Sequence, residues 1–300
     1  MRNSSAKYKI AILGASGMIG HKMSINLNIP EIELQCWVRS KEKIDELEKY
    51  IEKKSIRILD IKPSNFEMLC FELEKFNPDY IINCVGVTIR KEAENKLSNV
   101  IFANSLLPHL LSNWTSRKNK KLIHFSTDCV FNGSEDLYFD NSKPNEINLY
   151  GKSKSLGEVS YSMSTLTLRG SMIGRELFDK SELLEWFLNQ NNEVLGFSET
   201  YYSGITTERM SMYVKKIVLQ NLPIAGLYNV SSLPISKLEL LKIFKSVYHL
   251  QTLVREDSTK KSKKILKSEK FHSIIGEKIP SWEEDLKTDL IKEKIYYEQV

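Results

Sequence analysis

Residues 8–20 read Tyr-Lys-Ile-Ala-Ile-Leu-Gly-Ala-Ser-Gly-Met-Ile-Gly, an apolar run followed by glycines at every third position. The run predicts a buried β-strand, and the residues after Gly17 predict the start of a helix. Gly14 allows a sharp turn, Gly17 lets the backbone approach a phosphate, and Gly20 permits close packing of the helix on the strand. The N–H groups and dipole of the first helical turn attract phosphates. We therefore predict a dinucleotide-binding loop formed by Gly14, Ser16, Gly17, Met18, Ile19 and Gly20.

Strand-like and helix-like segments alternate through the first half of the chain. The apolar strand candidates are residues 8–13, 32–38, 56–59, 80–85 and 121–126. Helical patterns between them cover residues 18–27, 41–53, 65–76 and 92–114. Regular alternation with right-handed crossovers builds a parallel sheet with helices on both faces. We therefore predict an α/β fold with a doubly wound parallel sheet of the Rossmann type.

The pattern changes near residue 170. A long helix over 150–162 and a strand over 165–168 complete the first part. Beyond them we predict a helix over 181–188 capped by Ser181, short strands over 192–197 and 201–205, and helices over 206–219, 236–247 and 282–294. The chain is thus divided into a dinucleotide-binding domain, residues 1–170, and a smaller α+β substrate-binding region, residues 171–300. We expect the two to interleave.

The composition narrows the classes of partner. The chain has 43 basic and 38 acidic residues, a net charge of +5 that is compatible with a polyanionic small substrate. The densest basic run, residues 260–264, lacks the wide basic face with stacking aromatics that nucleic-acid binding needs. The four cysteines have no close-pair spacing, and no metal-ligand cluster stands out. We therefore predict that the protein binds no nucleic acid and no metal. Because the first apolar stretch is short, we also predict no membrane partner and a cytoplasmic location.

The end of the second strand bears on the choice of cofactor. An acidic residue there would bind the ribose hydroxyls, but this chain has Arg39 and Ser40 at that place. Since a guanidinium binds a 2′-phosphate through planar, charge-assisted hydrogen bonds, we predict NADPH and leave NADH open. Further cofactor contacts are predicted after the third and fourth strands, at Asp60, Ile61, Cys84, Val85 and Gly86.

Tyr150 and Lys154 are four residues apart, which places them on one face of a helix. A tyrosine is protonated at neutral pH and can give its proton to a carbonyl oxygen. A lysine ammonium at about 4 Å would favour the phenolate by about 4 kcal/mol, or about three pKa units. Lys154 can also hold the cofactor ribose, and the Thr127 hydroxyl can donate to the same carbonyl oxygen. We predict Thr127, Tyr150 and Lys154 as the catalytic residues.

These motifs resemble those of the extended short-chain dehydrogenases, and in particular the dTDP-4-dehydrorhamnose reductase family. The likeness rests on the glycine loop, on residues 124–133 (HFSTDCVFNG), and on Tyr150–Lys154 followed by Gly157-Glu158. Looser likenesses are residues 168–171 (LRGS) and 225–231 (AGLYNVS). The resemblance implies NAD(P)H-dependent reduction of a 4-keto group on a nucleotide-linked 6-deoxysugar, in the synthesis of surface-polysaccharide precursors. Homodimer formation stays open.

The substrate side is less specific. Cys129 stands where the family usually has tyrosine beside the sugar, so an N-acetylated 4-keto sugar on UDP is an alternative to the rhamnose precursor. Asp128 can bond a sugar hydroxyl or cap a turn. Arg169, Arg175 and Lys91 are candidates for a diphosphate, and Trp186 or Tyr202 for stacking, although surface or core roles suit them equally. The predicted substrate contacts are Asp128, Cys129 and Arg169.

Two other functions stay open on the same scaffold. An epimerase or dehydratase is the first; the dehydratases carry Thr-Asp-Glu where this chain has Thr127-Asp128-Cys129, and Arg39 favours an exchangeable NADPH over a retained NAD. A non-catalytic nucleotide-binding regulator is the second, but such a protein is expected to lose the tyrosine or the lysine. Both are present here.

Overall fold

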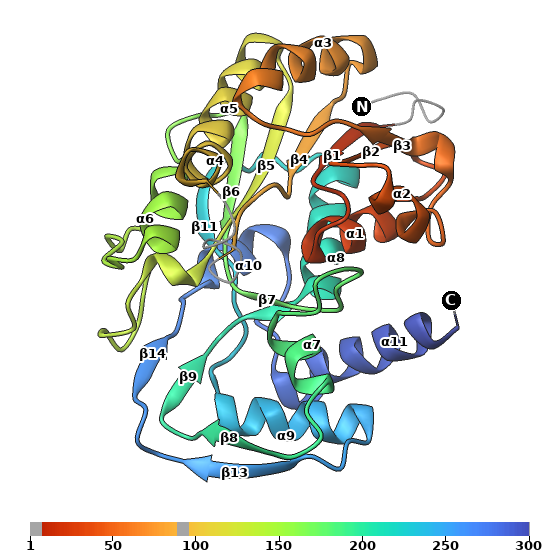
Figure 1. Ribbon diagram of the computed structural model, residues 1–300. Helices are drawn as coiled ribbons and strands as arrows, with labels where there is room; N and C mark the ends of the chain where they lie inside the picture. The colour runs from red at the N-terminus through yellow and green to blue at the C-terminus, as the bar shows by residue number, and fades with distance from the viewer. Residues whose placement is uncertain (1–7, 89–95, 300) are drawn as a thin grey trace.

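A seven-stranded, wholly parallel sheet forms the centre of the molecule, with strand order β11-β6-β5-β4-β1-β2-β3 (Figure 1). The computed structural model describes residues 8–88 and 96–299. The strands are β1 Tyr8–Leu13, β2 Ile32–Val38, β3 Ile56–Ile58, β4 Tyr80–Asn83, β5 Lys121–Ser126, β6 Thr165–Arg169 and β11 Gly226–Asn229. The predicted α/β class and doubly wound parallel sheet are confirmed.

The sheet is covered by helices on both faces, as the apolar runs of its strands require. Ile10 and Ile12 of β1 share one core with α1 Met18–Asn26, α2 Glu42–Leu47 and α8 Thr207–Leu219. Ala11 and Leu13, the alternating residues of the same strand, share a second core with α3 Phe66–Phe76 and α5 Leu107–Arg117. Alternate side chains of a strand point to opposite faces, so the two cores lie on opposite sides of the sheet.

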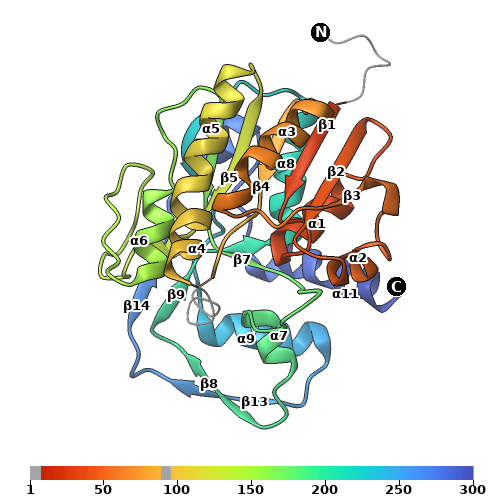
Figure 2. The same cartoon turned by 45° about the horizontal axis from the view of Figure 1, so that its top comes forward.

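The later part of the chain packs beyond the carboxyl ends of the strands (Figure 2). It contains α7 Leu183–Leu188, β8 Glu193–Phe197, β9 Thr200–Tyr202, α9 Lys237–Tyr248, β13 Leu253–Asp257, β14 Ser262–Lys264, α10 Glu269–Ile275 and α11 Lys287–Glu298. Short strands β7 Met172–Ile173, β10 Ile205–Thr206 and β12 Ile235–Ser236 complete it. Its apolar side chains, such as Phe187, Phe244 and Trp282, continue the core under α1 and α8. The sheet takes strands from both sides of residue 170, because β11 pairs with β6; the division at residue 170 stays a prediction.

Several elements end at other residues than predicted. Helix α6 covers Leu149–Leu156 and stops before residue 162, with Gly157 as its C-cap residue. A Cβ on Gly157 would be 1.9 Å from the Asn104 backbone oxygen, so only glycine fits there. The expected helix over 41–53 is the short α2. The N-cap of α7 is Glu182 rather than Ser181, with no side-chain cap. The strand expected over 201–205 is divided between β9 and β10.

The helix expected over 92–114 is only partly described, since residues 92–95 lie outside the described ranges. From Leu97 it runs through α4 Leu97–Ile101, a π-helical turn at Phe102–Leu106, and α5. None of the helices in residues 8–88 and 96–299 combines the length and apolar composition needed to cross a bilayer.

Strand order fixes where a ligand can bind. The chain winds from β1 outward to β3, then returns to form β4 on the other side of β1. At such a switch point the loops after the two strands turn in opposite directions and leave a crevice at their carboxyl ends. Here that crevice lies between Gly14, after β1, and Cys84, after β4.

Candidate active site

Two adjoining cavities open at the switch point. The first has a volume of about 330 Å³ and extends along the ends of β1, β2 and β3. The second has a volume of about 250 Å³ and extends along the ends of β4, β5 and β6. They share part of their lining: Gly17, Met18, Cys84, Val85, Gly86, Val87 and Glu176. A ligand longer than either cavity can therefore occupy both.

The glycine loop forms part of the wall common to both cavities. Gly14 has φ = +76°, a left-handed conformation that favours glycine, and a Cβ there would be 3.0 Å from the Cys84 carbonyl carbon. A Cβ on Gly20 would be 2.1 Å from the Gly14 oxygen, so this position requires close contact between helix and loop. A Cβ on Gly17 would lie 3.5 Å from the Gly14 oxygen, an ordinary contact distance, and Gly17 lines both cavities. Ser16 lines the first cavity and Ile19 the second.

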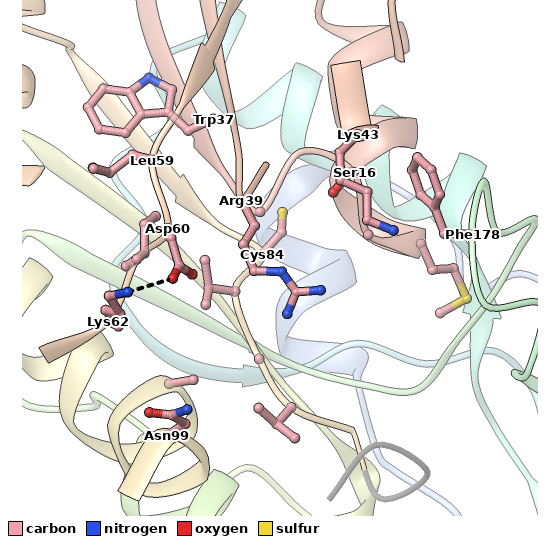
Figure 3. A pocket seen from close by; sticks show the side chains of 18 of the residues that line it. Ser16, Trp37, Arg39, Lys43, Leu59, Asp60, Lys62, Cys84, Asn99 and Phe178 are labelled. Atoms are coloured by element: carbon pink, nitrogen blue, oxygen red, sulfur yellow. Dashed lines mark ion pairs between the residues drawn. The ribbon is translucent and has the colours of Figure 1, made fainter. Parts of the chain in front are cut away.

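The far end of the first cavity carries charged side chains from the loop after β2, from α2 and from the loop after β3 (Figure 3). The exposed Arg39 projects into it and forms no ion pair with any residue that the structure describes. Lys62 pairs with Asp60 at 3.0 Å, and Ile61 lies beside them in the lining. Ser40 lines neither cavity; its hydroxyl bonds the Glu42 carboxylate, which lowers the pKa of Glu42.

The second cavity brings the three predicted catalytic side chains together. Thr127 follows β5, and Tyr150 and Lys154 lie on α6. The Thr127 hydroxyl accepts a bond from the Cys129 backbone N–H at 3.1 Å and donates to Asp128 at 3.2 Å. Lys154 Nζ donates to the Phe125 carbonyl at 2.7 Å. The arrangement offers a phenol, a hydroxyl and an ammonium within one cavity.

Lys154 was expected to favour the Tyr150 phenolate and so to lower the pKa of Tyr150. This expectation is wrong for this structure. Burial raises the pKa of the Tyr150 phenol well above its ordinary value, and the nearby Cys129 thiol adds to the rise. Burial also lowers the pKa of Lys154 to about 8, although Glu158 acts in the opposite direction. The Lys154 ammonium donates to the Phe125 carbonyl, and burial is the largest influence on the pKa of both side chains. Tyr150 is therefore a protonated donor at neutral pH.

The prediction that Arg169 contacts the substrate is wrong. Its guanidinium is buried and forms a two-pronged ion pair with Glu158, with both N–O distances 2.7 Å. It also donates to the Asp140 carbonyl and the Asn229 side chain at 3.2 Å each. Ser126, the last residue of β5, donates to the same Glu158 carboxylate at 2.6 Å. Arg169 thus joins β5, β6 and β11 to the end of α6 behind the cavity.

The other proposed substrate contacts differ in their placement. Cys129 lines the second cavity, whereas Asp128 is buried behind Thr127 and lines neither cavity. Arg175 pairs with Glu185 at 2.6 Å, and Tyr202 is buried beneath the Lys237 ammonium, 3.9 Å from its ring centre. Trp186 packs against the core rather than lining either cavity. Lys91 lies outside the described residues.

Sequence reasoning missed three acidic residues of the loop between β7 and α7 that line the cavities: Glu176, Asp179 and Glu182. Glu176 lines both cavities, and its carboxylate accepts bonds from the Ser181 and Glu182 backbone N–H groups at 2.7 Å each. Asp179 lines the first cavity, and Glu182 lines the second together with the three predicted catalytic residues. The loop has no motif that could have indicated these positions. No group of three or more potential metal ligands occurs within residues 8–88 and 96–299.

Comparison with known proteins agrees with this geometry. The model of a protein family described as "RmlD substrate binding domain" matches residues 8–173, more than half of the chain. The chain belongs to this family. The resemblance to dTDP-4-dehydrorhamnose reductases that the motifs indicated is therefore confirmed. One relative of this RmlD-family chain is the dTDP-4-dehydrorhamnose reductase of Aggregatibacter actinomycetemcomitans, 27% identical over 185 residues. That alignment covers 59% of this chain and 62%, less than two thirds, of the relative.

Solved structures share the fold of this RmlD-family chain. The dTDP-4-dehydrorhamnose reductase of Bacillus anthracis, in complex with NADP, superposes with a TM-score of 0.75 at 20% identity, covering 97% of this chain and 99% of that one. The dTDP-glucose 4,6-dehydratase of the same organism, in complex with NAD, gives 0.76 at 12% identity, covering 97% and 98%. At these identities the likeness concerns the fold.

Proposed function

We propose that this protein is an NADPH-dependent reductase of the 4-keto group of a nucleotide-linked 6-deoxysugar, with NADH left open. The observation that carries the proposal is the contiguity of the two cavities. One is lined by the glycine loop and Arg39, and the other by Thr127, Tyr150 and Lys154. The names of the reductase relative and of the NADP-bound neighbour support the same activity. Cytoplasmic location and homodimer formation stay predictions.

The residues present fit a nicotinamide dinucleotide. Gly17 and Met18 line both cavities, so the first turn of α1 lies where the two cavities meet. Unbonded helical N–H groups at such a turn bind pyrophosphate oxygens. Arg39 would hold a 2′-phosphate, with the adenosine between Asp60, Ile61 and the loop after β4. Lys154 would meet the ribose on the nicotinamide side.

The proposed chemistry assigns one task to each side chain. When bound, the cofactor supplies the hydride that adds to the carbonyl carbon. Tyr150, protonated at neutral pH, gives its proton to the carbonyl oxygen as negative charge develops there. Thr127 would turn its hydroxyl from Asp128 to the same oxygen. The Lys154 ammonium would favour the phenolate that remains after proton transfer.

The substrate class follows from the relatives and from Cys129. Cys129 lines the second cavity, and a thiol is smaller than the phenol usual at this place in the family, so we expect more room beside the sugar. This favours a bulkier substituent, such as an acetamido group on a UDP-linked 4-keto sugar. The product would be a 6-deoxysugar nucleotide for the synthesis of a surface polysaccharide.

A panel of dTDP- and UDP-linked 4-keto-6-deoxysugars, with and without an N-acetyl group, tests the proposal. Each is incubated with the protein and NADPH while the nicotinamide absorbance is followed. Substrate-dependent oxidation of NADPH supports a reductase. Isomer formation without net oxidation would identify an epimerase, and cofactor binding without turnover would identify a regulator; either result rejects the proposal.

Arg39→Asp is expected to shift the cofactor preference toward NADH. The change removes charge-assisted hydrogen bonds of about 1.5–3 kcal/mol and adds repulsion with the 2′-phosphate, so the ratio of NADPH to NADH affinity should fall about 10- to 150-fold. Isothermal titration with each nucleotide measures the ratio. Arg57→Asp makes the same charge change on β3, outside both cavities, and should leave it unchanged. An unaltered preference in Arg39→Asp would remove the argument for NADPH.

A further inference from the structure

The last helix of the chain, α11, contacts the helix that begins at the glycine loop, although more than 260 residues separate them along the chain (Figures 1 and 2). The Tyr297 hydroxyl of α11 lies 2.5 Å from Nε2 of His21 in α1. The two rings meet edge to face, with their centres 5.9 Å apart. Neither residue lines a cavity, and the mechanism proposed above uses neither.

His21 connects Tyr297 to the glycine loop, because its second ring nitrogen contacts Gly17. Its Nδ1 lies 3.0 Å from the Gly17 carbonyl oxygen, which also accepts the backbone N–H of His21 at 2.9 Å. His21 is fully buried, and burial lowers its pKa to about 4, so the ring is neutral at ordinary pH. A carbonyl oxygen only accepts, so the hydrogen-bond network assigns the proton to Nδ1. Nε2 is then the acceptor for the Tyr297 hydroxyl, whose pKa is raised by burial.

The Gly17 carbonyl fixes an N–H group that faces the cavities. The peptide unit between Gly17 and Met18 is planar and trans, so its C=O and N–H point in opposite directions. Holding the Gly17 oxygen toward His21 therefore aims the Met18 N–H away from the helix body. Gly17 and Met18 line both cavities, at the place where the proposed dinucleotide passes between them.

We propose that Tyr297 is a positioning residue for the phosphate-binding loop: through His21 it orients the Gly17–Met18 peptide so that the Met18 N–H meets the cofactor pyrophosphate. The chain's last helix is thus part of the cofactor site without contacting the cofactor. This inference rests on the proposed function in one respect, since it takes the ligand of the loop to be a dinucleotide.

Other contacts hold α11 in place, which allows the hydroxyl to be tested alone. Lys22 of α1 is buried and pairs with Glu293 of α11 at 3.2 Å and with Glu208 of α8 at 3.3 Å. Leu290 of α11 is fully buried in the main core. The ring of Tyr297 also packs on Tyr50 and Tyr296. Removing one oxygen from Tyr297 leaves all of these contacts intact.

The experiment compares Tyr297→Phe with Tyr296→Phe, its neighbour on the same helix. Tyr296 also packs against Tyr50, and against Tyr297 itself, but the hydrogen bond to His21 comes from Tyr297. Loss of one hydrogen bond predicts an increase of about three- to tenfold in the Kd for NADPH with Tyr297→Phe. The KM for NADPH should rise with kcat unchanged, whereas Tyr296→Phe should match the wild type. Amide hydrogen exchange over residues 14–20, measured without cofactor, should accelerate only in Tyr297→Phe.

A double-mutant cycle tests whether the effect of Tyr297 acts through His21. In a His21→Gln background the link is already altered, so Tyr297→Phe should have no further effect on affinity or exchange. Wild-type affinity and exchange in Tyr297→Phe, or equal changes in both tyrosine variants, would overturn the proposal. A wild-type protein that binds no nicotinamide nucleotide would reject the proposed function instead. In that case the exchange comparison still decides whether Tyr297 orders the loop.

Discussion

Tyr150→Phe is expected to lower kcat for reduction of the nucleotide sugar by a factor of about 10²–10⁴, the usual contribution of a positioned general acid. The variant keeps the ring that lines the second cavity and removes only the hydroxyl that gives its proton to the carbonyl oxygen. Because burial raises the pKa of this phenol, no pH near neutrality populates the phenolate in the free protein. The loss should therefore be similar from about pH 6 to pH 8. Initial rates of NADPH oxidation at saturating substrate measure it.

Controls separate chemistry from binding in this variant. The Kd for NADPH should change by no more than a few-fold, because the proposed contacts of the adenosine and pyrophosphate lie in the first cavity. Tyr161→Phe removes an equivalent hydroxyl from an exposed tyrosine beyond α6 and should leave kcat unchanged. Turnover at the wild-type rate in Tyr150→Phe would refute its assignment as proton donor.

Arg169→Met is expected to lower the free energy of unfolding by about 3–5 kcal/mol. The substitution leaves the Glu158 carboxylate buried, still bonded to Ser126 but without its two-pronged partner. A buried charge that loses its counter-ion must be desolvated without compensation. The loss is large against the about 5–15 kcal/mol typical of a folded protein. Chemical denaturation, followed by circular dichroism, measures it.

Two further variants serve as controls for the stability loss in Arg169→Met. Arg255→Met removes an arginine from an exposed pair with Glu193 at 3.5 Å and should cost less than about 1 kcal/mol. Arg169→Lys keeps the charge but not the planar guanidinium. Its free energy of unfolding should therefore lie between those of the wild type and Arg169→Met, and the variant should remain folded. Equal stability of wild type and Arg169→Met would show that the buried network does not support the fold.

Local patterns in the chain were sufficient for much of the fold. Strands β1, β2 and β5 appear at the predicted residues, because each contributes apolar side chains to the cores on both faces of the sheet. The turn at Gly14 was predictable because a left-handed backbone favours glycine. The spacing of Tyr150 and Lys154 predicted that they share a helix face, and both line one cavity. Each of these features depends on residues close together in the sequence.

Features that depend on distant residues were decided by the tertiary structure alone. Arg169 was expected at the substrate, but the fold encloses it with Glu158, and the lower energy of a paired buried charge keeps it there. The raised pKa of Tyr150 reflects burial by segments that no spacing rule brings together. The bond from Tyr297 to His21 joins the two ends of the chain. Burial and hydrogen bonding act through space, so the sequence names the groups and only the packed chain determines which of them meet.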